Sequence, residues 1–229
     1  MNSPVRRIVD LSHPINSETQ VYPGDPSPSL TPATTIVQDG FNVLHVSMGS
    51  QTGTHVDAPY HFLGDGARID ELDLSLFLGP ATIVDLRGLP ARSSIGWAHL
   101  EPYAEAMRPG RILVLHTGWS EHWRSAAYLD HPFLDQEAAE RIVSTGVRTV
   151  AVDAMSVDET PAEGAEPGSY PVHHVLLGVG GVIVENLTNV ASVDFADPMI
   201  SVLPIRLDDA DGAPVRAVAL ELELAYAPR

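Results

Sequence analysis

Four short runs of almost wholly apolar residues constrain the fold more than any other feature of this sequence. They are residues 81–86, 111–116, 148–153 and 181–185. Runs of this kind are typical of strands buried on both faces of a parallel or mixed sheet. Helical patterns lie between them, at residues 96–107, 135–144 and 173–177. Strands that alternate with helices indicate the α/β class.

Each apolar run ends in a polar residue. These residues are Asp85, His116, Asp153 and Glu185. Ligands of open α/β sheets bind outside the carboxyl ends of the strands, so a functional site is expected there. Acidic residues also end strands because they favour turns, and Asp85 fits that simpler interpretation.

The first third of the chain has the patterns of strands and turns. Extended segments are predicted at residues 7–14, 34–38 and 41–48, with the hairpin signal Asp39-Gly40 between the last two. Near the C-terminus, residues 200–207 and 215–222 flank an Asp-rich turn and are predicted to close the sheet as a hairpin. We predict one domain, residues 1–229, with a mixed sheet and a β-rich N-terminal part.

The composition argues against several classes of partner. The chain has 229 residues, with 13 basic against 30 acidic side chains and a net charge of −17. Nucleic acids and anionic membranes are therefore not expected to bind, and a small molecule is the expected partner. There is no cysteine, so a metal must be held by histidine and carboxylate groups. No stretch approaches the ~20 apolar residues of a membrane span or resembles a signal peptide, so the cytoplasm is the expected location.

The densest cluster of chemically active side chains is the segment QTGTHVDAPYHF. It places His55, Asp57 and His61 within seven positions. If the segment is extended, alternate residues from Gln51 to Asp57 lie on one face of a strand, and Gly53 leaves space beside the backbone. An imidazole and a carboxylate two positions apart on one face suit a divalent metal.

A proline punctuates the end of this segment. Pro59 cannot donate a hydrogen bond to a sheet, so the strand is expected to end near it and His61 to enter from a turn. A histidine placed there can move protons beside a metal. The residue types alone leave open an alternative, a hydrogen-bonded polar cluster on a half-exposed strand.

Two other features bear on a site. Residues 156–169 are polar and rich in glycine and proline, which suits either a lid or a solvated connector. Tyr22 and Phe62 are predicted to line an apolar pocket for an aromatic substrate, although aromatic side chains more often belong to the core.

Several motifs together resemble a known family. In chain order they are Leu-Ser-His-Pro at 11–14, Tyr-Pro-Gly-Asp at 22–25, Gly-Thr-His-x-Asp-x-Pro-x-His-Phe at 53–62, Val-Asp-Ala-Met-Ser-Val-Asp at 152–158, His-His-Val-Leu-Leu-Gly at 173–178 and Ile-Val-Glu-Asn-Leu at 183–187. On these motifs the chain resembles the metal-dependent cyclase family, which includes bacterial kynurenine formamidases and isatin hydrolases. The resemblance covers nearly all of the chain from Leu11 to the region of Leu187.

This resemblance implies a swivelling β/α/β fold, usually a homodimer or homotetramer, that hydrolyses a linear or cyclic amide at one or two divalent ions, Mn or Zn. Carried over by position, His55 and Asp57 are metal ligands. His173 and Glu185 complete the coordination, and His61 is the general acid/base. His174 is a rival for the third ligand, but only His173 has the family's spacing of twelve residues to the glutamate.

Gln51 departs from the family pattern, which has a histidine ligand there. A Gln amide oxygen is a weaker and neutral ligand, so we treat Gln51 as a ligand that favours one ion over two, or manganese over zinc. Asp153 and Ser156 are predicted to support the site by orienting a ligand histidine, with the alternative that Asp153 caps the following loop.

The predicted function is a metal-dependent amidohydrolase, in which His61 assists a water activated by the metal. One alternative is a relative with a changed substrate, such as a biosynthetic cyclase or dehydratase. Another is a non-catalytic member that binds a metal or ligand, although binding alone would not need His61. The histidines without a predicted catalytic role are His13, His45, His99, His116, His122 and His131.

Overall fold

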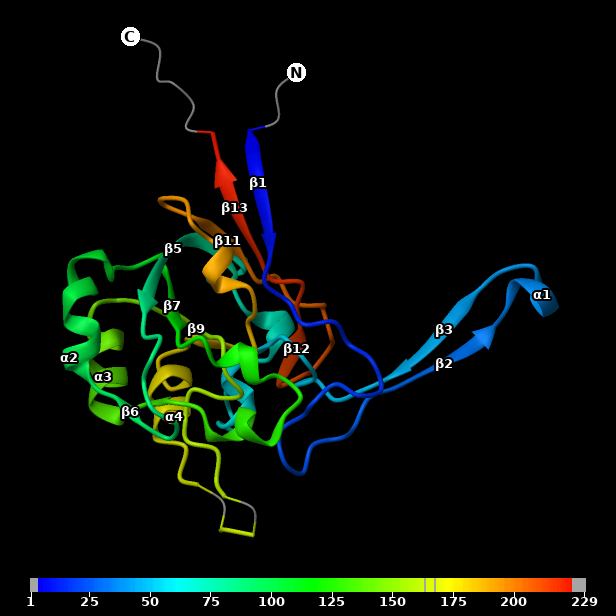
Figure 1. Ribbon diagram of the computed structural model, residues 1–229, viewed down its shortest axis with the longest axis horizontal. Coiled ribbons are helices and arrows are strands. Elements are labelled where there is room, and N and C mark those ends of the chain that lie inside the picture. Colours follow the sequence, from blue (N-terminus) through cyan, green and yellow to red (C-terminus); the bar gives the residue numbers. More distant parts are fainter. Residues whose placement is uncertain (1–3, 163, 167, 224–229) are drawn as a thin grey trace.

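The fold is built on one large mixed sheet. The computed structural model describes residues 4–162, 164–166 and 168–223, so positions 163 and 167 of the predicted lid lie outside the described part. In sheet order the strands are β1 (Val5–Asp10), β13 (Val218–Leu222), β11 (Met199–Ser201), β5 (Leu78–Asp85), β7 (Ile112–His116), β9 (Thr149–Val152), β10 (Val182–Glu185), β4 (His55–Asp57) and β12 (Gly212–Pro214). The four central strands β5, β7, β9 and β10 are parallel to one another, and the remaining pairs of this sheet are antiparallel (Figure 1).

The central strands are buried on both faces, as their apolar composition predicts. Alternate residues of β7 enter different cores: Ile112 and Val114 pack in one cluster, Leu113 and Leu115 in the other. This second cluster also contains apolar residues of α2 (Trp97–Leu100), α3 (Gln136–Ser144) and α4 (Pro171–Leu177). The four strands predicted from the apolar runs and the α/β class are therefore confirmed.

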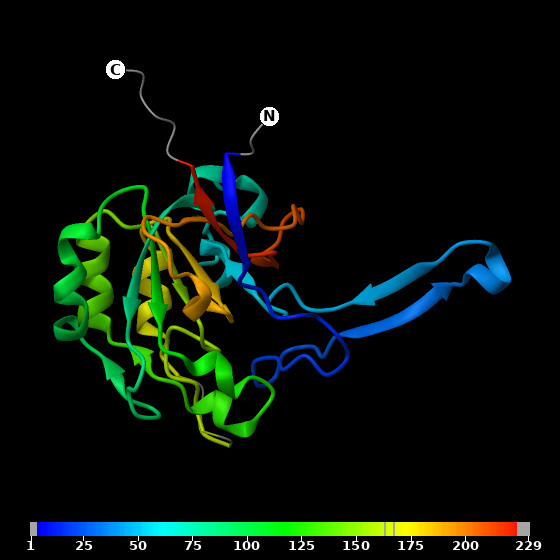
Figure 2. The same cartoon turned by 45° about the horizontal axis from the view of Figure 1, so that its top comes forward.

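The other core lies inside a curl of the sheet. Val9 and Ala219 from one end of the sheet share it with Val56 and Ala213 from the other end. Figure 2 shows the end strands turned toward each other above the central strands. This single sheet therefore joins strands from both ends of the chain.

One of the predicted helices differs from the structure, and another begins where it was predicted. The helix expected at residues 96–107 is broken into α2 and a 3-10 helix, Glu101–Ala106, because Pro102 cannot continue the α-helical hydrogen bonds. Helix α3 begins after Asp135 as predicted, since this side chain accepts a hydrogen bond from the backbone N–H of Ala138 at 2.7 Å. None of the described helices is long and apolar enough to cross a membrane.

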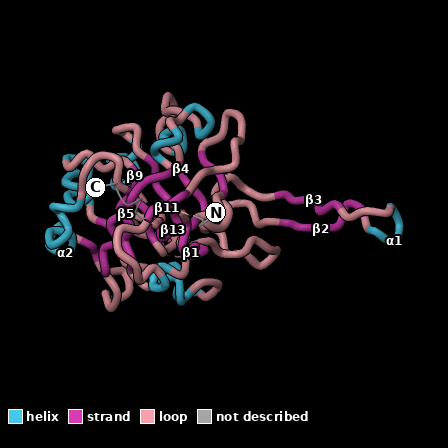
Figure 3. The backbone as a smooth tube through the Cα atoms, turned by 90° about the horizontal axis from the view of Figure 1, so that it is seen from above, coloured by secondary structure: helices cyan, strands magenta, loops and turns pink. Residues whose placement is uncertain are grey.

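A two-stranded arm projects from the body (Figure 3). It consists of β2 (Ser29–Thr34), α1 (Ile36–Asp39) and β3 (Val43–Ser47), and β2 pairs only with β3 among the described strands. The prediction of a strand at residues 34–38 is wrong. Thr35 caps a helical turn that Gly40 ends with φ of 83°, so capping outweighs the strand preference of Ile36 and Val37.

The prediction of a C-terminal hairpin from residues 200–207 and 215–222 is only partly correct. Strands β11 and β13 are antiparallel neighbours, but β12 lies between them in sequence and pairs with β4 on the far side of the sheet. Like the arm, the short parallel pair of β6 (Ser94–Ile95) and β8 (Phe133–Leu134) lies outside the main sheet. The pairing of β12 positions residues beside the segment that the sequence marks as functional.

Candidate metal centre

The segment around His55 is not extended throughout. Gly53 has φ of 69°, so the chain turns there and strand β4 begins only at His55. The prediction that residues 51 to 57 share one strand face is therefore wrong, and Gln51 reaches the site from the preceding turn. The strand ends at Asp57, and a 3-10 helix, Pro59–His61, brings His61 into the site as predicted.

Register in the sheet brings the distant acidic residue to this segment. Strand β10 pairs antiparallel with β4, and Glu185 lies directly opposite His55. Helix α4 supplies His173, which is buried, whereas its neighbour His174 is exposed. The four residues predicted as principal ligands are thus brought together, and His173 is the histidine that faces them.

Ligand atoms of His55, Asp57 and Glu185 all lie within 4.8 Å of one another, a spacing that suits a cation. His173 lies beside this group. Nε2 of His55 is 3.3 Å from Oδ1 of Asp57 and 3.6 Å from Oε2 of Glu185. Nε2 of His173 is 3.6 Å from Oδ2 of Asp57 and 3.5 Å from Oε1 of Glu185. These separations are long for hydrogen bonds, but two ligands that share an ion at ~2.1 Å lie about 3.0–3.5 Å apart. Histidines and carboxylates therefore alternate around a common space.

Both imidazoles are held so that Nε2 faces this space. Nδ1 of His55 contacts the backbone oxygen of Gly53 at 2.8 Å, and Nδ1 of His173 contacts Oδ2 of Asp158 at 2.7 Å. Each contact places the proton on Nδ1 and leaves the Nε2 lone pair free. Metal-binding histidines are commonly fixed in this way by a carbonyl or a carboxylate.

The carboxylate of Asp57 has no hydrogen-bond partner among the described residues, although both oxygens are buried. A buried carboxylate without a hydrogen-bond partner is unfavourable, so this group fits a bound cation. Burial lowers the pKa of His55, but contacts with Asp57 and Glu185 outweigh burial and raise this pKa to about 9. Burial likewise lowers the pKa of His173, yet its acidic neighbours raise it well above the ordinary value. Protons on the histidines thus balance the acidic groups, and a metal would displace them.

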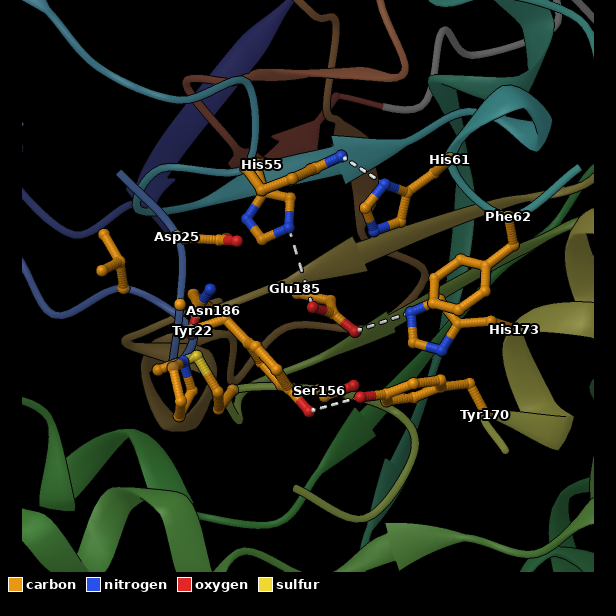
Figure 4. Close-up of a pocket in the computed structure, with 15 residues that line it drawn as sticks. Tyr22, Asp25, His55, His61, Phe62, Ser156, Tyr170, His173, Glu185 and Asn186 are labelled. Atoms are coloured by element: carbon orange, nitrogen blue, oxygen red, sulfur yellow. Dashed lines mark hydrogen bonds and ion pairs between the residues drawn. The ribbon is translucent and has the colours of Figure 1, made fainter. Parts of the chain in front are cut away.

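His61 lies beside the four predicted ligands and makes its hydrogen bond outside their group. Its Nδ1 hydrogen-bonds Oδ2 of Asp211 at 2.9 Å. Burial lowers the pKa of His61, but this contact and the negative charges of Asp57 and Asp211 together outweigh burial and raise the pKa. Its ring centre is 6.2 Å from that of His173. In Figure 4 the second ring nitrogen of His61 points into the pocket that Glu185 and His173 also face. The ring can therefore exchange a proton with a group in that pocket.

The centre opens into a cavity of about 410 Å³. Tyr22 and Phe62 line it, as predicted, together with Tyr170 and Ser156. The hydroxyl oxygens of Tyr22 and Tyr170 are 3.3 Å apart, and the Phe62 ring centre lies 4.4 Å from that of His173. One wall of the cavity is thus aromatic, and another carries the histidines and Glu185 (Figure 4).

The contacts of Asp153 correct its predicted role. Its carboxylate accepts hydrogen bonds from Thr117 and from the backbone N–H of Gly118, and among the described residues it makes none with a ligand histidine. It therefore fixes the turn after β7, not the loop that follows its own strand. Ser156 lies on the cavity wall, and its oxygen accepts from the backbone N–H of Asp158 at 3.3 Å.

Three acidic residues near the centre were not chosen from the sequence. Asp158 holds His173, Asp211 holds His61, and Asp25 lines the cavity with a pKa raised by burial. Asp25 and Asp158 fall inside motifs of the family resemblance, so those motifs contained a signal. Asp211 has no such signal, because it reaches the site through the pairing of β12 with β4.

The replacement Asp158→Asn is expected to weaken metal binding by about 10–100-fold, because the charged partner of His173 Nδ1 is lost. Titration of the metal-free protein with Mn²⁺ or Zn²⁺ measures this change. Glu159→Gln is the control, since Glu159 is exposed and pairs with Arg92. Equal affinities of Asp158→Asn and the control would contradict the role given to Asp158.

Comparison with known proteins agrees with this geometry. The model of a family described as "Putative cyclase" matches residues 9–159. The chain belongs to the cyclase family. A kynurenine formamidase of Bacillus cytotoxicus is 36% identical over 212 residues, which cover 92% of this chain and 95% of that protein. A kynurenine formamidase of Bacillus anthracis is 35% identical over 214 residues, with the same shares covered.

Solved structures show the same fold in this cyclase-family chain. An isatin hydrolase bound to the product analogue thioisatinate superposes with a TM-score of 0.84 at 22% identity, covering 94% of this chain and 92% of that one. Isatin hydrolase A from Ralstonia solanacearum gives a TM-score of 0.84 at 22% identity, covering 93% and 91%. The family predicted from the sequence motifs is confirmed.

Proposed function

We propose that this cyclase-family chain is a metal-dependent amidohydrolase that cleaves an amide C–N bond. The observation that carries the proposal is the buried carboxylate of Asp57, which lacks a hydrogen-bond partner between two imidazoles whose Nε2 atoms face it. A site built only for structure would supply hydrogen-bond partners to such a buried carboxylate. His61, beside this centre, distinguishes a catalytic site from one that only binds.

His55, Asp57, His173 and Glu185 would hold one divalent cation. A bound divalent cation polarises an amide carbonyl and lowers the pKa of water from ~15.7 toward ~7. His61 takes a proton from the attacking water at Nε2 and gives it to the leaving nitrogen, which completes cleavage of the C–N bond. Asp57 has one oxygen toward each histidine, so in the alternative arrangement with two ions it could serve as a ligand for both.

Gln51 is the proposed fifth ligand. Its Oε1 is buried and has no hydrogen-bond partner among the described residues. A neutral amide oxygen suits Mn²⁺ better than Zn²⁺, which prefers imidazole nitrogen. Metal analysis of the purified protein tests both identity and stoichiometry. The proposal expects one ion per chain.

The aromatic wall of the cavity supports an aromatic amide as substrate. Tyr22 and Phe62 can stack on a benzene ring while the amide carbonyl faces the metal centre. N-formylkynurenine, a linear formamide, and isatin, a cyclic amide, are the two substrates to assay before and after chelation. Turnover of either one that disappears with the metal and returns with Mn²⁺ or Zn²⁺ supports the proposal. Full turnover in metal-free protein would overturn it.

Two alternatives concern the reaction, not the site. A relative with a changed substrate, such as a biosynthetic cyclase or dehydratase, would bind the metal yet hydrolyse neither amide. A non-catalytic member would bind the metal equally well in the presence or absence of His61. Because His61 has its own carboxylate partner in Asp211, catalysis is the better-supported reading.

We further propose that the chain forms a homodimer or homotetramer through the arm, residues 29–47. All five residues of β3 are exposed, and Val37 on α1 is 95% exposed. An isolated two-stranded hairpin is marginally stable, and a large exposed apolar surface usually marks an interface. A second copy of this chain would cover it.

The cytoplasm remains the predicted location.

The double replacement Leu44→Glu and Val46→Glu is expected to convert the oligomer to monomers. Both side chains are exposed, and they lie two positions apart on one face of β3. Light scattering coupled to size-exclusion chromatography measures the mass. Gln38→Glu is the control, because it changes the charge of the arm at an exposed polar position. A wild-type protein that is monomeric, or a double variant that keeps the wild-type oligomer, would contradict this proposal.

A further inference from the structure

Asp211 accepts hydrogen bonds from three side chains beside the predicted metal centre, although it has no role in the proposed reaction so far. Its Oδ2 accepts from Nδ1 of His61 at 2.9 Å and from Nε2 of Gln51 at 2.8 Å. Its Oδ1 accepts from the hydroxyl of Ser50 at 2.7 Å. Both carboxylate oxygens are therefore used, and two of the three partners line the cavity.

The backbone around Asp211 is fixed as firmly as its side chain. The backbone oxygen of Asp211 accepts from the N–H of Ala58 at 2.9 Å. A Cβ atom at Gly212 would lie 2.5 Å from the backbone oxygen of Val56 and 2.7 Å from Nε2 of Gln51, so this position has no room for a side chain. The loop before β12 is thus packed directly against β4, and Asp211 is held at a set distance from His61.

This geometry determines which nitrogen of His61 carries the proton. Nδ1 of His61 lies 2.9 Å from the carboxylate of Asp211, which can only accept a hydrogen bond, and 3.2 Å from Nε2 of Gln51, which can only donate one. The shorter contact is with the charged acceptor, so the neutral ring keeps its proton on Nδ1. Nε2 is then the unprotonated nitrogen, and it is the one directed into the pocket in Figure 4. Without an acceptor at Nδ1 the ring could turn or carry its proton on Nε2, and it could not act as a base toward the pocket.

We propose that Asp211 is a positioning residue, which holds His61 with its proton on Nδ1 and its Nε2 toward the substrate. The proposal rests on the proposed function, in which His61 moves the proton during hydrolysis. Asp211 also holds the nitrogen of Gln51, which leaves the amide oxygen of Gln51 as the free acceptor. One carboxylate thereby orients two side chains of the cavity.

The test compares Asp211→Asn with the matched replacement Asp209→Asn in the metal-loaded enzyme. Asp209 lies in the same loop, but its carboxylate is exposed and pairs with Arg68, away from the centre. Asp211→Asn is expected to lower kcat by about 10²-fold or more, within the range for loss of an acid/base residue, with little change in KM. Metal content should equal that of the wild type in both variants, and Asp209→Asn should keep full activity.

A double variant separates positioning from a general structural effect. If Asp211 acts through His61, adding Asp211→Asn to His61→Ala lowers kcat no further, because residues that act as a unit are not additive. Additive losses, or loss of the metal in Asp211→Asn, would overturn the proposal. If His61→Ala retains full activity, the proposed function fails instead, so the two failures are distinguishable.

A second measurement needs no catalysis and no replacement of Asp211. Nitrogen–proton correlation spectra of the metal-free protein, labelled with ¹⁵N-histidine and recorded at alkaline pH, report the tautomer of each neutral ring. The signals of His61 are assigned by their absence from His61→Ala. The proposal expects the proton on Nδ1 in the wild type. A proton on Nε2 would overturn it even if Asp211→Asn fails to fold.

Discussion

Asp57→Asn is expected to remove the bound metal and to lower amide hydrolysis by about 10³-fold or more, since metal catalysis contributes several kcal/mol of transition-state stabilisation. Asp57 has an oxygen facing each of the two imidazoles, at 3.3 Å from His55 and 3.6 Å from His173. Both of these oxygens are buried and lack a hydrogen-bond partner among the described residues. The asparagine keeps the shape of the side chain but supplies one neutral oxygen in place of two charged ones.

Thermal unfolding provides a readout of this variant that is independent of activity. A metal that binds only the folded protein raises the melting temperature, so Mn²⁺ or Zn²⁺ should stabilise the metal-free wild type. The same additions should leave Asp57→Asn unchanged. Asp194→Asn is the control, because this exposed carboxylate pairs with Arg7 far from the centre. Stabilisation of Asp57→Asn by the metal, equal to that of the wild type, would show that Asp57 is not a ligand.

His61→Ala is expected to lower kcat by about 10²–10⁴-fold, the usual contribution of a placed general acid/base, while the metal content stays that of the wild type. The structural reason is that His61 lies beside the ligands and makes its polar contacts with Asp211 and Gln51. Steady-state kinetics and metal analysis on the same preparation measure both quantities.

The control for this variant is His99→Ala. His99 is exposed on α2, and its ring contacts only the backbone of Gly96 among the described residues. It should keep full activity and metal content. If His61→Ala loses its metal, His61 is a ligand, and the separation of roles between His61 and the other two histidines is wrong.

Much of the fold could be predicted because its central strands have a simple composition. The runs that became β5, β7, β9 and β10 are apolar on both faces, and a soluble protein can bury such strands only inside a covered sheet. The arm was harder to predict. Ile36 and Val37 favour a strand by propensity, but Thr35 and Gly40 cap a helical turn around them. Local capping therefore decided the conformation there.

The site was predictable where its residues lie close in sequence, and less so elsewhere. His55, Asp57 and His61 form one motif, and the family resemblance supplied His173 and Glu185. Their convergence depends on the register of β10 with β4, which a spacing alone does not reveal. That register, and the contacts it creates between distant residues, are set when the sheet folds and not by the local sequence.

The carboxylates behind the histidines illustrate the same limit. Asp153 ends a buried strand, which favoured it as the residue that orients a ligand, but Asp158 five positions later has that contact. Asp211 lies 150 positions from His61 along the chain. Its position depends on β12. This strand has only three residues and follows an Asp-rich turn, so it was not predicted from the sequence.

Anomalous diffraction from crystals of active protein, recorded at the absorption edge of the metal it contains, tests the central claim most directly. The account predicts a strong peak enclosed by the side chains of His55, Asp57, His173 and Glu185, lost on chelation together with the activity. An active crystal with its peak elsewhere, or with no peak between these four residues, would contradict the account.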